Sequence, residues 1–316
     1  MNKWAAGLAG AAFAIFAPAW ADAPPAGSAT ETFQKIYGAE WKWRQQQFPG
    51  VNSEDRESGA GDLRLPAVDA KTQSARLAYW DDVLKQLSAV KSAELSPEDQ
   101  INFAVFRPQI ENLASGVRLR DYEMPFNSDS QFWSDLTFMA NRPFKNEKAA
   151  RAYIARLDDV PRFFDEQIAN MRAGLKRGFS VPRAVLDGRD VSISTIAEVK
   201  GAADSVFFKP FVQLPATLPV DEQAKLRADA ERAIREHVLP AYSRLLRFFR
   251  EEYVPQARTT LAAEALPDGK AYYRQQIREY TTLDLAPEAI HQIGLKEVAR
   301  IDAQMRETMR ATGFKG

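Results

Sequence analysis

The sequence predicts an all-α protein, an irregular multi-helix bundle in which prolines kink the long helices. Three observations carry this prediction. Apolar residues recur at spacings of three and four along most of the chain, as on one face of an α-helix. No convincing run alternates apolar and polar residues, and no internal repeat is visible. Strong helix starts stand at Ser96-Pro97-Glu98-Asp99 and at Pro219-Val220-Asp221-Glu222.

Residues 1–21 have the pattern of a cleavable signal peptide. A short basic start is followed by an apolar, alanine-rich stretch over residues 4–16. Ala19-Trp20-Ala21 has the small-x-small form that signal peptidase recognises, so we expect cleavage before Asp22. A membrane anchor is the alternative, but an apolar run of about thirteen residues is short of the roughly twenty that a bilayer requires. We therefore expect a periplasmic or secreted protein with no membrane contact after cleavage.

The rest of the chain divides into two predicted regions. Residues 22–66 are expected to form an N-terminal helix and a linker, and residues 67–316 a helical domain that is incomplete at its C-terminus. The linker 49–66 is rich in glycine, serine and aspartate. Helices are expected at residues 29–47, 70–91, 97–122, 130–140, 145–176, 193–208, 221–253, 270–280 and 287–311.

Three prolines, Pro108, Pro161 and Pro240, fall inside long helical patterns. Each removes a backbone donor and clashes with the preceding turn, so each is expected to kink or split its helix. Two interpretations stay open. Bent helices can curve around a substrate cleft, or pairs of shorter helices can meet at a corner.

Composition agrees with a globular protein and excludes some partners. Apolar residues are 45% of the chain and charged residues 27%, close to the usual averages. Lys plus Arg and Asp plus Glu are 42 each, so the formal net charge is zero. A neutral chain has no bulk attraction to nucleic acid, and we expect no nucleic-acid partner. The sequence has no cysteine, so it has neither a lipoprotein attachment site nor a disulfide.

The sequence contains few residues that could bind a metal or carry out catalysis. The chain has two histidines, His237 and His291, while a zinc site needs three or four ligands from His, Cys and carboxylates. Neither His-Glu-x-x-His nor Gly-x-Ser-x-Gly occurs. A site that joins both histidines to a distant acid is one interpretation, and two ordinary helical histidines are the other. No metal ligands and no catalytic residues can be assigned from these 316 residues.

The segment 266–316 carries the most specific signals. A Leu266-Pro267-Asp268-Gly269 turn precedes a helical pattern, and a second helix starts near Pro287. Apolar residues mark one face of that second helix, and Gly313 is placed to end it. A further element is expected where the sequence stops. The apolar stripe consists of Ile290, Ile293, Val298, Ile301, Met305 and Met309.

This segment resembles a bacterial family catalogued as domain of unknown function 885. The likeness continues more weakly upstream, in residues 174–182 and 242–258. Where family members often carry His-Thr-Thr, this chain has Tyr280-Thr281-Thr282. The motifs that carry the resemblance are Leu266-Pro267-x-Gly269-x-x-Tyr272-Tyr273, Tyr280-Thr281-Thr282, Ile290-His291-x-x-Gly294-Leu295-x-Glu297-Val298-x-Arg300-Ile301 and Gly313-Phe314-x-Gly316.

The resemblance implies a function. Family members look like mainly helical, often exported, metal-dependent hydrolases of the peptidase kind, and they are longer than this chain. Their metal motif, a His-Glu pair followed by Pro-Gly-His-His, lies downstream of the Gly-Phe-x-Gly stretch, and nothing in this sequence matches it. The resemblance thus implies the N-terminal part of a larger zincin-like protein, with zinc or another divalent metal bound by the missing C-terminal part.

Five residues of the same segment are candidates for substrate binding: Tyr272, Tyr273, Thr281, Thr282 and His291. A tyrosine hydroxyl can bind a substrate carbonyl or stabilise an oxyanion. Adjacent residues on a helix diverge, so only one of the two tyrosines is expected to face a pocket. The alternatives are a half-buried core tyrosine, threonines that cap the helix, and a histidine used in packing.

We therefore expect an exported protein that shapes the cleft for a peptide or amide-type small substrate, while the metal and the general base come from beyond residue 316. Alone, these residues are expected to be inactive. The alternative is a non-catalytic periplasmic binding or scaffold protein. The two differ in exposed apolar surface, because part of a larger protein leaves a large uncovered patch and a complete protein does not.

Overall fold

The structure, a computed structural model, describes residues 28–48 and 64–313 and is all-helical there. The predicted signal peptide and most of the predicted linker lie outside these residues. Within the described residues, the only pairing of the β type is an isolated bridge between Phe126 and Gln131. The α-helices are α1 Ala29–Gln47, α2 Ala70–Ser88, α3 Pro97–Leu119, α4 Phe132–Asp135, α5 Glu147–Arg177, α6 Val191–Ala197, α7 Lys209–Val212, α8 Val220–Ala233, α9 Leu239–Phe248, α10 Val254–Gln256, α11 Gly269–Thr281 and α12 Pro287–Ala311.

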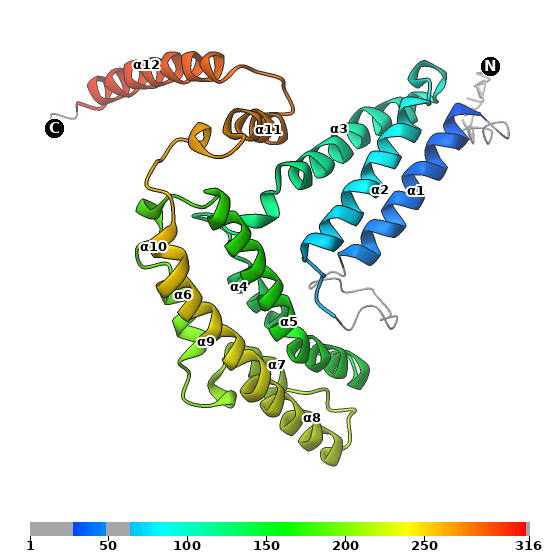
Figure 1. Cartoon of the computed structure of the whole chain (residues 1–316), viewed down its shortest axis with the longest axis vertical. Coiled ribbons are helices and arrows are strands. Elements are labelled where there is room, and N and C mark those ends of the chain that lie inside the picture. Colours follow the sequence, from blue (N-terminus) through cyan, green and yellow to red (C-terminus); the bar gives the residue numbers. More distant parts are fainter. Residues whose placement is uncertain (1–27, 49–63, 314–316) are drawn as a thin grey trace, which may run out of the picture.

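Helices α1, α2 and α3 lie side by side and share one core (Figure 1). Trp80 and Leu87 of α2 meet Phe33 of α1 and Phe106 of α3, all of them buried. Serine and aspartate start these helices. Ser28 accepts a hydrogen bond from the Glu31 amide, as expected of residues that cap the free N–H groups of a first turn.

A second, larger core forms around α5, the longest helix, which packs against α8 and α9. Its apolar face buries Leu157, Phe164 and Met171. Buried tyrosines are tied to backbone groups across this core: the Tyr242 hydroxyl donates to the Trp133 carbonyl at 2.6 Å. The tyrosine hydroxyl therefore keeps a hydrogen bond while the ring is buried.

The prolines act differently from one helix to another. α3 and α5 continue through Pro108 and Pro161 as single helices. Pro240 and Pro255 instead follow two π-helical turns, Ile234–Val238 and Phe249–Tyr253. Proline has no backbone N–H to donate, and its ring needs space in the preceding turn. A π-helical turn before each proline is wider than an α-helical one and is consistent with both requirements.

Two predicted helices were wrong in part. The expected helix 193–208 is the short α6, followed by the 3₁₀ turns Ala202–Asp204 and Val206–Phe208. α6 ends at Ala197, and Gly201 takes an extended conformation just before the first of these turns. The expected helix 130–140 is α only in its first turn and then tightens into the 3₁₀ helix Leu136–Asn141.

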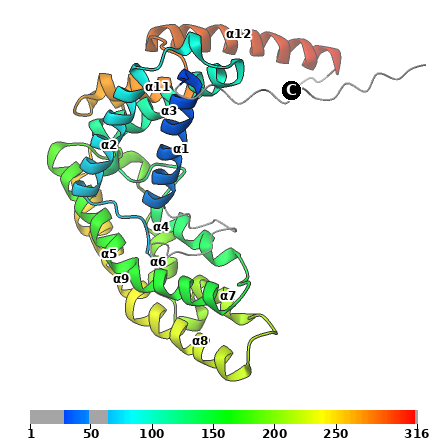
Figure 2. The same cartoon turned by 90° about the vertical axis from the view of Figure 1, so that its right-hand side faces the viewer.

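Helices α11 and α12 follow the second core. Both views place α12 at one end of the molecule (Figures 1 and 2), and none of its residues is buried. Its bounds agree with the predicted range 287–311. α11 packs against α3, where Gln275 donates to the Asn112 side chain at 3.0 Å.

Candidate functional site

An open cavity of about 640 Å³ lies between the start of α2, the 3₁₀ turn Asp121–Glu123 and the middle of α5. Alanines form its apolar part, and acidic side chains and one arginine surround them. Ala70, Ala169 and Ala173 are exposed to solvent within it, so a bound group would contact them directly. The lining residues are Asp69, Ala70, Tyr122, Glu123, Arg162, Asp165, Glu166, Ala169, Asn170 and Ala173.

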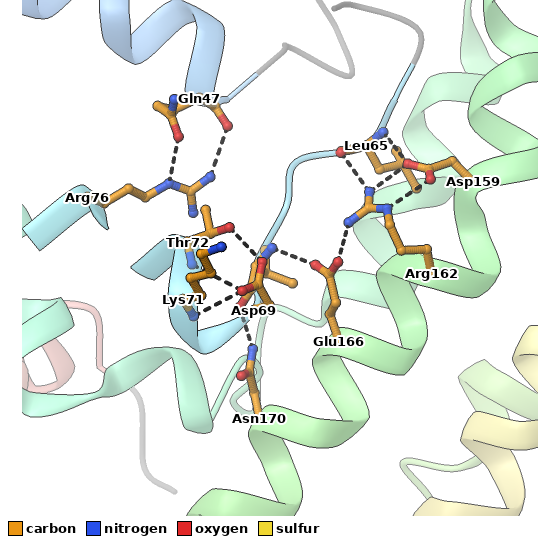
Figure 3. A network of polar contacts seen from close by, with 11 residues as sticks. Gln47, Leu65, Asp69, Lys71, Thr72, Arg76, Asp159, Arg162, Glu166 and Asn170 are labelled. Carbon is orange, nitrogen blue, oxygen red and sulfur yellow. Dashed lines mark hydrogen bonds and ion pairs between the residues drawn. The ribbon is translucent and has the colours of Figure 1, made fainter. Parts of the chain in front are cut away.

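One wall of this cavity exists because an extended segment before α2 is fastened along α5. The Leu65 amide donates to Asp159 at 2.9 Å, and the Val68 amide donates to Glu166 at 2.7 Å. Asn170 completes the attachment by donating to the Val68 carbonyl at 2.7 Å (Figure 3). These bonds satisfy backbone groups that have no helix or sheet to pair in.

Arg162 joins both carboxylates of this attachment. Its guanidinium donates to Asp159 at 2.6 Å, to Glu166 at 2.7 Å and to the Leu65 carbonyl at 2.8 Å. The hydrogen bonds to Asp159 hold the pKa of Arg162 above its usual value. Such a charge-assisted, multiply bonded arginine has a fixed orientation, so this side of the cavity is rigid.

Asp69 forms the edge of the cavity and starts α2. It accepts hydrogen bonds from the Lys71 amide at 2.9 Å and from the Thr72 hydroxyl at 2.6 Å. The Thr72 hydroxyl is the main reason why the pKa of Asp69 lies below its usual value. The carboxylate is therefore ionised and already engaged as a helix cap.

Arg76 lies about two turns beyond Asp69 along α2 and is 2% exposed. It donates to the Gln47 carbonyl at 3.0 Å and stacks over the Phe48 ring at 4.3 Å from its centroid. Burial lowers its pKa to about 10. Gln47, which ends α1, is thereby tied to α2 (Figure 3).

The cavity is suited to binding rather than to chemistry of its own. Asp69 and Glu166 already accept hydrogen bonds from backbone amides, and Glu166 accepts another from Arg162. Glu123, which is buried, pairs with Arg177. An apolar floor with polar groups at its edge fits an extended chain that presents both small side chains and amides.

The candidate residues of α11 point in different directions. Tyr272 packs edge-on against Phe179, with ring centroids 5.3 Å apart, and burial raises the pKa of its hydroxyl. Tyr273 is 37% exposed. Tyr272 is thus the inward-facing tyrosine of the pair. It lies near Asp121, which neighbours the cavity residue Tyr122 in sequence.

The other three candidates have local contacts. The Thr281 hydroxyl donates to the Ile277 carbonyl at 2.6 Å, and Thr282 ends α11 in the left-handed conformation with φ of 60°. His291 is exposed in the first turn of α12. None of the five candidates lines the cavity described above, and their role in substrate binding stays a prediction.

Sequence reasoning missed Asp121 and the Arg162 network. Burial raises the pKa of the Asp121 carboxyl to about 6, and Glu279 on α11 adds to this effect. A Cβ added at Gly116 would lie 2.4 Å from the Asp121 Oδ2 atom, so any larger residue there would have to displace this carboxylate. The sequence signal for Arg162 was the helical spacing of Asp159, Arg162 and Glu166, which brings all three to one face.

The residues described do not fit a metal ion. Across residues 28–48 and 64–313, no three or more His, Cys, Asp or Glu side chains lie together as a metal site requires. His237 Nε2 lies 3.6 Å from Asp158 Oδ1, an arrangement of one histidine and one acid. The same residues contain no helix long and apolar enough to span a bilayer.

Comparisons with known proteins agree on the fold and the family. A family profile described as "Bacterial protein of unknown function (DUF885)" matches residues 49–316. A solved structure titled "The crystal structure of the putative lipoprotein from Colwellia psychrerythraea" is similar, with a TM-score of 0.75 and 19% identity. The similarity covers 92% of this chain and 52% of that one, so this chain spans about half its length. No curated protein matches the sequence.

Proposed function

The chain belongs to the DUF885 family of bacterial proteins, and on that premise we propose that it is the N-terminal part of a larger, exported, metal-dependent hydrolase. In this proposal the substrate is a peptide or a related amide. The described residues form one wall of the substrate cleft, and the C-terminal part of the same protein supplies the metal and the general base.

The cavity beside α5 is the observation that carries the cleft role. It is open and of a size that holds a few residues of an extended chain. Its rigid side is built by Arg162 between Asp159 and Glu166, which keeps its shape fixed without using a free catalytic group. A positioning wall needs that combination of rigidity and chemical inertness.

Export is supported by the first 21 residues and by the similar solved structure, whose title calls that protein a "putative lipoprotein". The pattern of a basic start, an apolar stretch and Ala19-Trp20-Ala21 is that of a cleavable signal. In this proposal the mature protein works in the periplasm or outside the cell.

The metal belongs to the remainder of the protein in this proposal, because the donor set described above does not fit one. A bound zinc or another divalent ion would activate water and polarise the scissile carbonyl. The described residues would bind and orient the substrate and exclude water. In this proposal Tyr272 donates its hydroxyl hydrogen to a substrate oxygen.

A non-catalytic periplasmic binding or scaffold protein is the second candidate. It is favoured by the engaged state of the cavity carboxylates, which bind without reacting. The two candidates predict different outcomes for a variant that fills the cavity, because only a hydrolase loses turnover.

The test fills the cavity without disturbing the core. Ala173→Leu adds a side chain at an exposed cavity alanine, and Ala224→Leu is its matched control on an exposed face of α8. In the longest natural product, we expect Ala173→Leu to lower kcat/KM for peptide amides by about tenfold or more and leave metal content unchanged. The control should match the wild type. If the Ala173→Leu and Ala224→Leu proteins both bind metal and hydrolyse amides equally well, the cleft assignment is wrong.

A further inference from the structure

Helix α12 presents an apolar face that nothing in the described chain covers. Val298 is 67% exposed and Met305 is 59% exposed, values usual for surface lysines rather than for valine and methionine. Ile301 and Met309 are exposed on the same helix. A contiguous apolar surface of this kind on a soluble protein marks an interaction site.

The face is continuous and wide. At about 100° per residue, Ile290, Val298, Ile301, Met305 and Met309 fall within an arc of about 100°, and Ile293 of the predicted stripe lies outside it. Lys296, Arg300 and Glu307 lie on the opposite side. A stripe of that width is typical of a helix that packs into a globular core, and a two-stranded coiled coil uses a narrower seam.

We propose that the apolar face of α12 is an internal interface, covered in the whole protein by the polypeptide that follows residue 316. This inference rests on the proposal that the chain is part of a larger protein and does not depend on hydrolase chemistry. Its partner is a folded, mainly apolar surface of the same polypeptide.

Two observations favour this occupant. The solved structure with the same fold has nearly half of its length outside the region that this chain matches, so a longer protein of this fold has chain available to cover α12. α12 itself carries four basic residues, Lys296, Arg300, Arg306 and Arg310, and four acidic ones, Glu288, Glu297, Asp302 and Glu307. Being neutral, the helix lacks the cationic face with which amphipathic helices bind anionic membranes.

Single cysteines test the interface, since these 316 residues contain none. Met305→Cys places a thiol on the apolar face, and Glu307→Cys places one two residues away on the polar face. Both are made in the longest natural gene product. The rate of maleimide labelling is measured in buffer and in urea, and each folded rate is divided by its own denatured rate. Val298→Cys and Lys296→Cys form a second pair if one variant of the first pair fails to fold.

The interface predicts that Met305→Cys reacts about tenfold or more slowly than Glu307→Cys after this normalisation. Equal rates overturn the inference, as does a natural polypeptide that ends at Gly316. Protection that disappears on dilution overturns it in favour of a second copy of the chain. The measurement needs no substrate. If Met305→Cys is protected but the protein hydrolyses no amide, the interface stands and the hydrolase proposal fails. If the protein hydrolyses amides but Met305→Cys is not protected, the hydrolase proposal stands and the interface fails.

Discussion

Replacing Asp121 by asparagine is expected to stabilise the protein at neutral pH. The carboxyl lies between the end of α3 and α11, and burial raises its pKa from 3.8 to about 6. Glu279 of α11 adds a like charge nearby. Asparagine has the same shape, accepts the same backbone hydrogen bond and carries no charge, so it removes only the cost of ionising a buried group.

The size of the effect follows from the pKa difference between the folded and unfolded states. About two pKa units correspond to roughly 3 kcal/mol. Because the folded pKa is the higher one, the stability of the wild type is full below pH 3.8 and falls as the pH rises through 6. The variant should match the wild type well below pH 3.8, gain about 1 kcal/mol at pH 4.5 and gain up to about 3 kcal/mol above pH 6.

Urea unfolding at pH 4.5 and at pH 7.5 measures this difference. Asp129→Asn, in an exposed loop, is the matched control and should change little at either pH. An Asp121→Asn protein that is less stable than the wild type at pH 7.5 refutes the reasoning, because the carboxylate would then make a contact that the fold needs. A gain that is equal at both pH values refutes it too.

Four further changes test other parts of the structure by their urea midpoints. Arg162→Met should lose about 3 kcal/mol, since it leaves two partly buried carboxylates without a partner; the exposed pair of Arg172 makes Arg172→Met a control with a loss of about 1 kcal/mol or less. Leu87→Ala should cost about 2–5 kcal/mol, because Leu87 is fully buried. Gly269→Ala should cost about 1–3 kcal/mol, since its Cβ would meet the Ala263 carbonyl at 2.4 Å. Gly294→Ala, with open space around it, should be neutral or stabilising by up to about 1 kcal/mol in the chain described here.

Long helices could be predicted from the sequence because their signals are local. α12 has an early proline, an apolar stripe and a closing glycine, and its predicted range agrees with the structure. The segment after α6 could not be predicted in the same way. Its aromatic residues repeat at helical spacing, but Phe207 and Phe208 are buried from 3₁₀ turns whose geometry tertiary packing decides.

The cavity could not be predicted because its parts are distant in sequence. The Leu65 amide and Asp159 are 94 residues apart, and no local pattern joins them. The helical spacing of Asp159, Arg162 and Glu166 is a local signal of an ion-pair face, but the sequence-based prediction did not use it. What it could not indicate was the extended segment that this face holds. Helical geometry did predict that Tyr272 and Tyr273 diverge, and Tyr272 packs against Phe179 while Tyr273 is exposed; that one of them faces a substrate pocket stays a prediction.

The metal content of the longest natural gene product, after folding and dialysis, tests the account most directly. We predict stoichiometric zinc or another divalent ion in a protein that hydrolyses peptide amides, with ligands supplied from beyond residue 316. A folded, monomeric and metal-free product without hydrolase activity contradicts this account and leaves a binding or scaffold role in its place.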